Sequence, residues 1–494
     1  DQTGYDPCEP SIIINPKNTS HMVAGAIIDR YYYSTDGGYT WNYENLTSPW
    51  GVWGDPVVVI DTASAYYYLH LANPPSGQGS WIDRIIVQKI DEIGGSWNQK
   101  SYMGKNGTKA QDKEWAVFDT ENNNMYVTWT QFDQYGTADP DKYSNILFSK
   151  SIDGGATWSE ALQINEVSGN CVDSDNTVEG AVPAVGPNGE IYVGWVGPAG
   201  LVFDRSLDQG ETWLEEDIFV SDVPGGWDYD IPGISRCNGL PVTKCDLSGG
   251  PNHGNIYINW TDQRNGTDDT DVWLVKSTDG GNTWTEPIRV NNDPPGRHQF
   301  FTWMDVDQAN GNLWFVWYDR RNHDDVGTDV YMAVSYDGGE TFHNFKVSES
   351  PFYPVSNFFF GDYTNISVYD NVIRPIWTRL QDGIMSVWTA DVDPYIVGTE
   401  ENIPNLLSME QNYPNPFKSS TRIAYKIMEP TKASLRIYDM YGKEVAVLFE
   451  NKYHFRGKFI ESFDPQEYEL PVGAYFFKLS SDNFVVKRKM IFVR

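Results

Sequence analysis

The sequence "SIDGGATW" at residues 151–158 decides the fold, because it is one of a series of similar turns. The same eight-residue pattern stands at four other places, "STDGGYTW" at 34–41, "SLDQGETW" at 206–213, "STDGGNTW" at 277–284 and "SYDGGETF" at 335–342. With an irregular sixth copy, "KIDEIGGSWN" at 89–98, the turns recur at intervals of about 55–70 residues. Such a period indicates a repeat architecture.

The residues of each turn explain its shape. An Asp carboxylate accepts backbone N–H bonds across a turn, and Gly adopts the positive φ values that other residues avoid. The Trp or Phe at the end of the pattern can then pack back over a hairpin. We therefore expect one hairpin module to be repeated along the chain.

Two further series of segments keep the same phase. Five strand-like segments end in a tryptophan, namely Trp129, Trp195, Trp260, Trp317 and Trp377. Upstream lie seven short apolar segments, which begin at residues 9, 55, 114, 179, 239, 300 and 362. Because the tryptophans follow the repeat, we expect them to pack one unit against the next, and a sugar-stacking platform is the alternative.

The eight-residue pattern resembles the Asp-box of sialidases and related proteins. The resemblance implies an all-β fold in which residues 1–395 form a β-propeller of four-stranded antiparallel blades. The seven inner strands predict seven blades; sialidases have six, so six blades with an irregular first repeat is the alternative. The last blade lacks an obvious fourth strand, which a segment of the N-terminus could supply. In this family the Asp-box joins the third and fourth strands on the outer rim of one face, so we expect it to be scaffold and not catalytic.

The charge of the chain restricts its partners. The formal net charge is −32, and residues 406–494 carry 14 Lys+Arg against 10 Asp+Glu, so the acidic excess lies in the first 405 residues. An acidic surface repels nucleic acid and anionic membranes, and no apolar run approaches the roughly 20 residues that cross a bilayer. We expect no nucleic-acid partner and no membrane insertion. The chain begins at Asp1, as after removal of a signal peptide.

Four cysteines occur without a CxxC spacing. Cys237 and Cys245 enclose a short loop and are predicted to form a disulfide in an oxidising compartment. Buried thiols are the alternative. Spacing gives no support to a pair between Cys8 and Cys171.

Acidic residues introduce several of the inner strands, and propeller topology brings such positions together around the channel on the face opposite the Asp-boxes. The candidate catalytic residues are Glu9, Asp55, Glu114, Glu179 and Asp362, together with Tyr363. Carboxylates at a channel mouth can act as acid, base or nucleophile in glycoside cleavage, or hold a cation. Alternatively, they cap strand starts by accepting backbone N–H bonds from the next blade.

Basic residues provide the candidates for substrate binding: Arg236, Arg297, His298 and Arg374. By resemblance, a sialidase grips its substrate carboxylate with three arginines and uses a tyrosine nucleophile assisted by a glutamate. Arg236, Arg297 and Arg374 could form such a set with Tyr363. However, the first inner strand, "CEPSIIINP", lacks the arginine of the family motif, and the acid beside Tyr363 is an aspartate. The resemblance is therefore used for the fold and not for the activity.

Two similar loops, "DQRNGTDDTD" at 262–271 and "DRRNHDDVGTD" at 319–329, are rich in hard oxygen ligands. The candidate Ca²⁺ ligands are Asp262, Asp268, Asp269, Asp271, Asp319, Asp324, Asp325 and Asp329. A solvated acidic loop, partly neutralised by Arg264, Arg320 and Arg321, is the alternative. No organic cofactor is expected.

The repeat stops after Asp393, and residues 396–405 ("IVGTEENIPN") are predicted to be a linker. Residues 406–494 contain "NYPNPF", "YDMYGKEV" and "PVGAYFFKL" and end in a basic segment. They resemble the C-terminal sorting domain of the type IX secretion system of Bacteroidetes-like bacteria. The resemblance implies transport by that machinery to the outer surface or the medium, and the alternating apolar pattern predicts a small Ig-like antiparallel β-sandwich.

Two hypotheses follow for the whole chain. The first is a secreted or surface-attached sialidase-like propeller that binds an extracellular polysaccharide or a glycoprotein glycan. If it is an enzyme, we expect it to hydrolyse glycosidic bonds through two of the five carboxylates. The second is a non-catalytic adhesin or structural subunit of a surface layer or filament, which would self-assemble.

Overall fold

The computed structural model describes residues 7–394, 407–409, 411–427, 430–440, 442–481 and 485–493. The chain divides into two compact units, Asp1–Val392 and Asp393–Arg494. The described residues contain strands and one short 3-10 helix, Pro465–Tyr468, and no α-helix. The predicted all-β class is therefore confirmed. The predicted linker at 396–405, and any strand supplied by the first six residues, lie outside the described residues.

Within residues 7–394, the first unit forms seven antiparallel sheets whose strands follow chain order, six of four strands and one of three. Sheet 1 consists of β1 (Ser11–Ile14), β2 (Met22–Ala26), β3 (Arg30–Ser34) and β4 (Asn42–Asn45). Sheet 2 consists of β5 (Gly54–Ile60), β6 (Tyr66–Leu71), β7 (Ile85–Ile90) and β8 (Gln99–Met103). Sheet 3 consists of β9 (Ala110–Phe118), β10 (Met125–Phe132), β11 (Ser144–Ser151) and β12 (Leu162–Gln163). Sheet 4 consists of β13 (Glu179–Val185), β14 (Ile191–Gly197), β15 (Gly200–Ser206) and β16 (Ile218–Ser221). Sheet 5 consists of β17 (Val242–Cys245), β18 (Ile256–Asp262), β19 (Asp271–Ser277) and β20 (Ile288–Arg289). Sheet 6 consists of β21 (Gln299–Val306), β22 (Leu313–Asp319), β23 (Asp329–Ser335) and β24 (His343–Lys346). Sheet 7 consists of β25 (Asn365–Tyr369), β26 (Val372–Gln381) and β27 (Ile384–Thr389).

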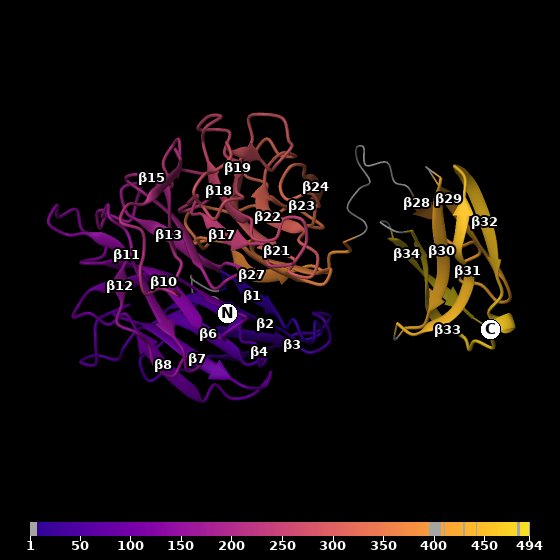
Figure 1. The fold of residues 1–494 in the computed structure, drawn as a ribbon, viewed down its shortest axis with the longest axis horizontal. Coiled ribbons are helices and arrows are strands. Elements are labelled where there is room, and N and C mark those ends of the chain that lie inside the picture. The colour runs from indigo at the N-terminus through magenta and orange to yellow at the C-terminus, as the bar shows by residue number, and fades with distance from the viewer. Residues whose placement is uncertain are drawn as a thin grey trace. The chain divides into compact units, whose positions relative to one another are not determined.

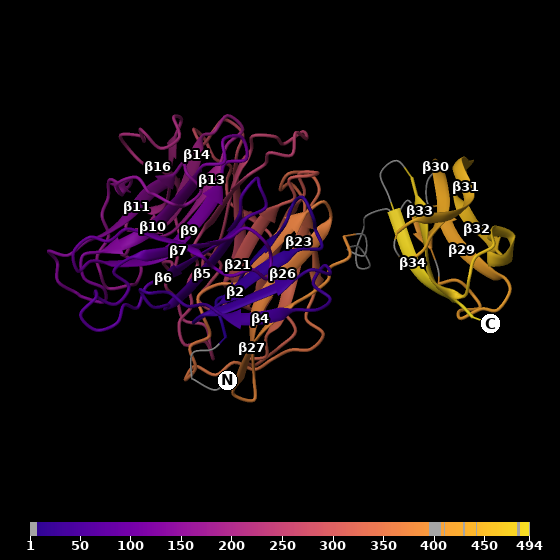
Figure 2. The same cartoon turned by 90° about the horizontal axis from the view of Figure 1, so that it is seen from below.

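The seven sheets follow one another around a closed ring. The first strand of each sheet packs against the first strands of the sheets before and after it, and β25 packs against β1 (Figures 1 and 2). Sheet 7 meets sheet 1 through side chains: the backbone N–H of Ile12 donates to Asn365 Oδ1 (3.4 Å), and that of Ile14 donates to Ser367 Oγ (3.0 Å). The first strands thus surround a common axis, and their N-terminal ends are brought together.

Each eight-residue turn joins the third and fourth strands of its sheet, as predicted. In the turn of sheet 3, Asp153 Oδ1 accepts from the backbone N–H of Thr157 (2.9 Å) and Asp153 Oδ2 accepts from Thr157 Oγ1 (2.6 Å). The same pair of bonds recurs in the other four regular turns. Hydrogen bonds from the Thr side chain lower the pKa of the turn aspartate to about 2 in Asp36, Asp208 and Asp279.

A cation from the preceding sheet clamps the turn. Lys150 Nζ donates to the carbonyl of Gln209 (2.9 Å), Lys276 Nζ to that of Gly338 (3.2 Å), and the Arg205 guanidinium to that of Gly280. Each acceptor is the residue directly after the turn aspartate. We call this contact the inter-sheet clamp. It links the turn of one sheet to the third strand of the sheet before it.

The second glycine of the turn allows close packing on the same neighbour. At Gly281, where φ is +88°, a Cβ atom would lie 2.3 Å from the Phe203 ring of the preceding sheet. At Gly210 it would lie 2.4 Å from the Phe148 ring. Both conformation and space therefore require glycine at these turns.

The five tryptophans of this series lie within the second strands and are buried, with exposed fractions of 0–4% for Trp129, Trp195, Trp260, Trp317 and Trp377. Three of them lie in hydrophobic clusters, to which neighbouring sheets contribute. The predicted packing role is confirmed, and these rings are not available for stacking on a sugar.

The predicted disulfide between Cys237 and Cys245 is wrong, since both cysteines are present as buried thiols. Cys237 lies before sheet 5, where its carbonyl accepts from the backbone N–H of Tyr229. Strand β17 then carries Cys245 about 10 Å beyond Val242, to the opposite end of the strand. A disulfide requires Cα atoms within about 7 Å of one another, so the short sequence spacing was misleading.

The second unit consists of a three-stranded sheet and a four-stranded sheet, both antiparallel. Its strands are β28 (Leu407–Met409), β29 (Thr421–Ile427), β30 (Thr431–Tyr438), β31 (Glu444–His454), β32 (Gly457–Phe463), β33 (Gly473–Ser480) and β34 (Val485–Phe492). Alternate residues of both sheets, such as Ile423, Leu435 and Phe477, form one hydrophobic core. The unit therefore has a core of its own.

Substitution of Gly281 tests how tightly the turns pack on the neighbouring sheet. Gly281→Ala should lose about 1–2 kcal/mol for a side chain at positive φ and about 1–3 kcal/mol more for overpacking against Phe203. Gly249→Ala is the matched control, because φ there is +75° but no atom lies within 4 Å of the added Cβ. Urea unfolding of both variants measures the difference, and equal losses would contradict the packing argument.

Candidate functional site

The N-terminal ends of the first strands carry residues in an unusual backbone conformation. Glu9, Asp55 and Lys113 have φ values of +51°, +49° and +52°, and Gly180 and Gly361 take positive φ at comparable places in sheets 4 and 7. β-Bulges interrupt the register beside Asp55, Lys113 and Gly180. A side chain at positive φ costs of the order of 1–3 kcal/mol and persists only where surrounding contacts fix it. The strain is therefore concentrated where the seven strands meet.

Two cations organise the acidic side chains at this end. Lys113 Nζ lies 2.7 Å from Asp362 Oδ2 and 3.3 Å from Asp55 Oδ2. Arg236 binds Asp362 with two of its nitrogens, and its Nη1 donates to Asp173 Oδ2 (2.9 Å). We call Glu9, Asp55, Asp112 and Asp362, with Lys113 and Arg236, the carboxylate cluster. It joins residues from five different parts of the ring.

The cluster holds carboxyl groups of opposite protonation. Burial, together with the Asp55 charge and a hydrogen bond to Asp55, raises the pKa of Glu9. Burial is also the main cause that raises the pKa of Asp112 to about 8. Burial opposes ionisation of Asp362 too, but the charges of Arg236 and Lys113 outweigh it and hold the pKa of Asp362 below its ordinary value. At neutral pH, protonated and ionised carboxyl groups therefore lie side by side.

Glu114 and Glu179 are buried next to the cluster. Within the described part of the chain, neither carboxylate oxygen of Glu114, nor Oε1 of Glu179, has a hydrogen-bond partner. Burial raises the pKa of both groups well above the ordinary value, followed by the charges of Asp55 on Glu114 and Asp173 on Glu179. The alternative that these residues cap the next blade fits Glu9, whose Oε1 accepts from the backbone N–H of Asp362 (3.1 Å), better than it fits Glu114.

Tyr363 lies beneath the cluster. Its ring contacts Trp115 and Trp303, with centroid distances of 5.2 and 6.2 Å, and its buried hydroxyl has no hydrogen-bond partner. A small cavity of about 20 Å³ is lined by these three rings and by Lys113 and Asp362. Its volume is that of about one water molecule.

A larger cavity of about 210 Å³ opens above the cluster. Glu9, Asp55, Asp112, Lys113 and Arg236 are among its polar lining residues. Its other side is lined by aromatic and apolar side chains, which are Trp53, Trp81, Tyr135, Phe359, Ile27, Ile28, Leu71 and Ile82.

Two tryptophans at this cavity remain partly exposed, with exposed fractions of 39% for Trp53 and 42% for Trp81. The two indoles meet edge to face at 5.7 Å, and Trp81 meets Tyr135 in the same way at 5.4 Å. The Tyr135 hydroxyl donates to Asp173 Oδ2 (2.5 Å), which ties the aromatic side to the charged one. The cavity thus combines a flat apolar surface with hydrogen-bonding groups.

The six predicted catalytic candidates all lie in or beside the carboxylate cluster, and Arg236 joins them. Arg297 and His298 do not line the cavity: Arg297 pairs with Asp324, and His298 Nδ1 contacts Thr270 Oγ1 at 3.2 Å. Burial, followed by the nearby charge of Arg320, lowers the pKa of His298 to about 4.

The predicted placement of Arg374 on this face is wrong. Its guanidinium donates to the carbonyl of Gly37 and pairs with Asp391, so it makes a contact like the inter-sheet clamp between sheets 7 and 1, but from the second strand of sheet 7 instead of the third. The side chain belongs to the Asp-box rim because the second strand runs from that rim toward the channel face, and Arg374 stands near its start. The three arginines therefore do not converge on one site.

The two predicted calcium loops carry internal ion pairs. Arg264 binds Asp262, Arg321 binds Asp319, and Arg289 binds Asp271. Asp329 pairs with Lys346 (2.9 Å), and Asp269 and Asp325 accept backbone N–H bonds. Asp268 is exposed. Calcium at these loops stays a prediction.

Several cavity residues were missed at the sequence level. Asp112 and Lys113 directly precede the predicted Glu114, and Trp53 directly precedes the strand that carries Asp55. Trp81 lies between β6 and β7, a second-to-third-strand connection that propeller topology places on this face. Neither tryptophan belongs to a repeated motif. Only their positions relative to the strands of the repeat could have indicated that they lie at the cavity.

Comparisons with known proteins agree with the repeat and the export domain. Residues 32–43 match the BNR/Asp-box repeat, and residues 411–493 match the secretion system C-terminal sorting domain. The second match implies secretion to the cell surface or the extracellular space. No curated protein matches the chain. Among the described residues, no helix has the length and apolar character needed to cross a membrane.

Similar solved structures include sialidases and other glycan-active propeller enzymes. A Hadza microbial sialidase is 13% identical over 75% of this chain and 73% of its own, with a TM-score of 0.43. A polysaccharide lyase of the PL25 ulvan lyase family is 12% identical over 80% of this chain and 96% of its own, with a TM-score of 0.47. An α-L-arabinanase of Penicillium chrysogenum is 15% identical over 68% and 94% of the two chains, with a TM-score of 0.41.

The raised pKa of Asp112 predicts a pH-dependent stability. A carboxyl group with a folded pKa of about 8 and an unfolded pKa of about 4 stabilises the fold fully below pH 4, and this contribution is lost as the pH rises toward 8. Asp112→Asn should therefore make the decline of unfolding free energy between pH 4 and 8 shallower, by up to about 1.4 kcal/mol per pH unit.

Denaturant unfolding at several pH values measures this slope, with Glu349→Gln, an exposed acidic position outside the cavity, as the control. The same slope in Asp112→Asn as in the unsubstituted protein would contradict the assignment of a buried, protonated Asp112.

Proposed function

We propose that this protein is an exported glycan-binding protein whose cavity above the carboxylate cluster receives a neutral sugar unit. The observation that carries the proposal is the pairing of two partly exposed tryptophans with a wall of carboxyl, ammonium and guanidinium groups in one cavity. A pyranose or furanose ring has apolar faces and a polar rim, so an aromatic surface beside fixed polar groups suits it.

The charges favour a neutral sugar over an acidic one. Arg236 already binds Asp362 with two nitrogens and Asp173 with a third. The ion pairs at the cavity contain three aspartates, Asp55, Asp173 and Asp362, but only two cations, Lys113 and Arg236. The site therefore carries no excess positive charge that could bind a substrate carboxylate. Recognition of a carboxylate by a guanidinium fork requires donors that are not already bound to protein carboxylates, and three of the five N–H donors of Arg236 are bound in this way.

We further propose that the seven sheets are the blades of a seven-bladed propeller and that the second unit is an Ig-like β-sandwich. The closed ring of first strands supports the former, and the shared core of two antiparallel sheets supports the latter. The sorting-domain match supports the type IX secretion machinery as the partner of the second unit.

Substitution of Trp81 tests the binding proposal. The probes are soluble neutral polysaccharides (a glucan, a mannan, a galactan and an arabinan) and the acidic polymer polygalacturonate, with affinity measured by calorimetry. Trp81→Ala should weaken binding to the preferred neutral polymer about 5- to 30-fold, since stacking on an aromatic ring is worth about 1–2 kcal/mol.

Trp388→Ala is the matched control, because Trp388 is 45% exposed but does not line the cavity. It should leave the affinity unchanged. Preference for polygalacturonate, or equal losses in the two variants, would exclude the proposed site.

A second candidate function is cleavage of the bound glycan's glycosidic bond, and the mixed protonation of the cluster favours it. A protonated Asp112 or Glu9 can donate a proton to the leaving oxygen, while the neighbouring Asp55 carboxylate accepts a proton from attacking water. Reducing-sugar release from the preferred polymer should fall at least about 100-fold in both Asp112→Asn and Asp55→Asn, while binding is retained. If the unsubstituted protein binds the polymer but releases no reducing sugar from it, cleavage is excluded and the protein is a non-catalytic glycan-binding protein.

A further inference from the structure

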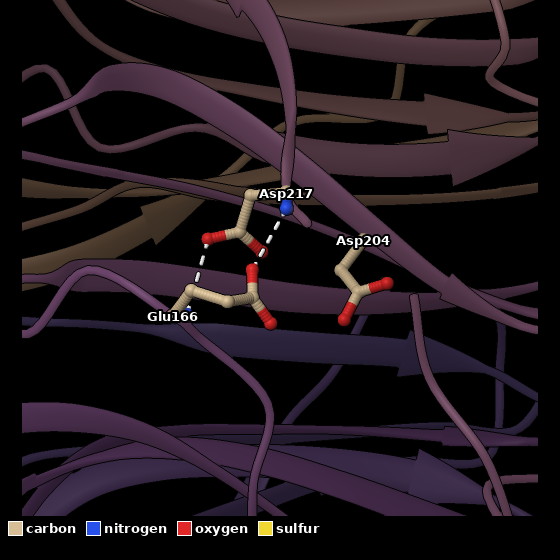
Figure 3. Close-up of side chains that lie close together, drawn as sticks. All are labelled: Glu166, Asp204 and Asp217. Carbon is tan, nitrogen blue, oxygen red and sulfur yellow. Dashed lines mark hydrogen bonds between the residues drawn. The ribbon is translucent and has the colours of Figure 1, made fainter. Parts of the chain in front are cut away.

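Three carboxylate groups converge between sheets 3 and 4, away from the cavity above the carboxylate cluster. Glu166 follows β12, the last strand of sheet 3, whereas Asp204 lies on β15 and Asp217 directly precedes β16 of sheet 4. One oxygen from each carboxylate lies within 4.8 Å of the others (Figure 3). No other set of three such groups with this spacing occurs among the residues that the structure describes.

Asp204 is fully buried, and only one of its carboxylate oxygens is satisfied by the protein. Oδ1 accepts from the backbone N–H groups of Arg205 (2.6 Å) and Leu214 (3.1 Å), whereas Oδ2 has no hydrogen-bond partner. The buried Oδ1 of Asp217 also has none. An unpaired buried carboxylate oxygen is costly, so two of them at one place indicate that a ligand belongs there.

Backbone contacts fix the positions of the other two groups. The backbone N–H of Asp217 donates to Glu166 Oε2 (2.7 Å), and that of Glu166 contacts Asp217 Oδ2 at 3.4 Å, as the dashed lines in Figure 3 show. This reciprocal pair joins sheet 3 to sheet 4. It also leaves the second oxygen of each carboxylate for another partner.

Carboxyl groups face each other at this place, and among the residues that the structure describes no basic side chain forms an ion pair with them, although the charge of Arg205 acts to lower the pKa of Asp204. The pairing of Phe203 with Ile218 puts Asp204 and Asp217 opposite one another on neighbouring strands, an unfavourable arrangement for two carboxylates. The nearest cation in sequence, Arg205, directs its guanidinium to the carbonyl of Gly280 and to Asn282.

The pKa values reflect this crowding. Burial raises the pKa of Asp204 to about 7, with Glu166 adding to the increase; burial and Glu166 together raise that of Asp217 to about 8. The aspartates of the 262–271 and 319–329 loops differ from this group, because arginine side chains bind Asp262, Asp271 and Asp319.

We propose that Glu166, Asp204 and Asp217 bind a divalent cation, Ca²⁺ by its preference for carboxylate oxygens, and that the ion fastens sheet 3 to sheet 4. Ca²⁺ accepts six to eight oxygen ligands in flexible geometry, and carboxylates bind it through one or both oxygens. The ion would satisfy the two unpaired buried oxygens and neutralise the facing aspartates. This site is independent of the glycan proposal and contributes to the stability of the ring.

Calcium titration of the full chain tests the site. Protein stripped with EDTA is titrated with CaCl₂ and, separately, with MgCl₂ at pH 8, where proton competition is reduced, and binding is followed by calorimetry and melting temperature. We expect one Ca²⁺ per chain with a dissociation constant of about 10⁻³ M or tighter, weaker binding of Mg²⁺, and a rise in melting temperature of about 2 °C or more at 10 mM CaCl₂.

Asp204→Asn assigns the effect to this group. This variant should bind Ca²⁺ at least about tenfold more weakly and show no rise in melting temperature on addition of calcium. In the absence of calcium it should melt no lower than the unsubstituted protein, because the substitution removes one of two facing charges. Glu215→Gln, an exposed position two residues from Asp217, is the control and should keep the rise. Asp217→Asn replaces Asp204→Asn if the latter does not fold.

Absence of Ca²⁺ binding to the unsubstituted protein would overturn the proposal. So would a full calcium response in Asp204→Asn and Asp217→Asn, since the ion would then lie elsewhere.

Discussion

In the turns of sheets 4, 5 and 6, the carbonyl group that follows the turn aspartate accepts a hydrogen bond from a lysine or arginine of the preceding sheet, and the spacing of these sheets depends on this contact. The turn aspartate fixes the local shape by binding the threonine four residues on, and glycine lets the turn approach an aromatic ring of its neighbour. The bonds within a turn therefore also determine how closely that turn packs on the neighbouring sheet. Arg374 donates to the corresponding carbonyl of the first sheet from the last sheet, so the same constraint also acts where the ring closes.

At the opposite ends of the first strands, the ring assembles groups that would separate if the sheets were not held together. Lys113 of sheet 3 and Arg236, from the connection between sheets 4 and 5, meet at Asp362, which precedes sheet 7. Buried charges are tolerated only when they are paired, and a carboxyl group without a partner becomes protonated. The mixture of protonated and ionised acids in the carboxylate cluster therefore follows from burying more acids than cations. Positive φ values at Glu9, Asp55 and Lys113 indicate that these side chains are held in place against a conformational cost.

The repeat made most of the fold predictable, because eight residues contain every bond that shapes the turn and the strands keep its phase. The same logic placed the six candidate catalytic residues in or beside the carboxylate cluster, since equivalent positions in a ring must meet. It could not find Trp81, which occurs once, outside any repeated motif. It misplaced Arg374, because a sequence does not state which end of a strand faces which rim. The predicted disulfide failed for a related reason: eight residues looked like a loop, but four of them form the extended β17, which separates Cys237 from Cys245.

The side-chain bonds between sheet 7 and sheet 1 have a consequence for the order of folding. Ile12 and Ile14 donate to residues 353 positions later in the chain, so the first sheet gains these partners only after nearly the whole ring has been synthesised. Contacts of such long sequence separation carry the entropic cost of closing a very long loop and form late. Until then, the apolar edges of the first and last sheets have no cover. A chain destined for export would thus stay open and vulnerable to aggregation or chaperone capture until its final sheet docks.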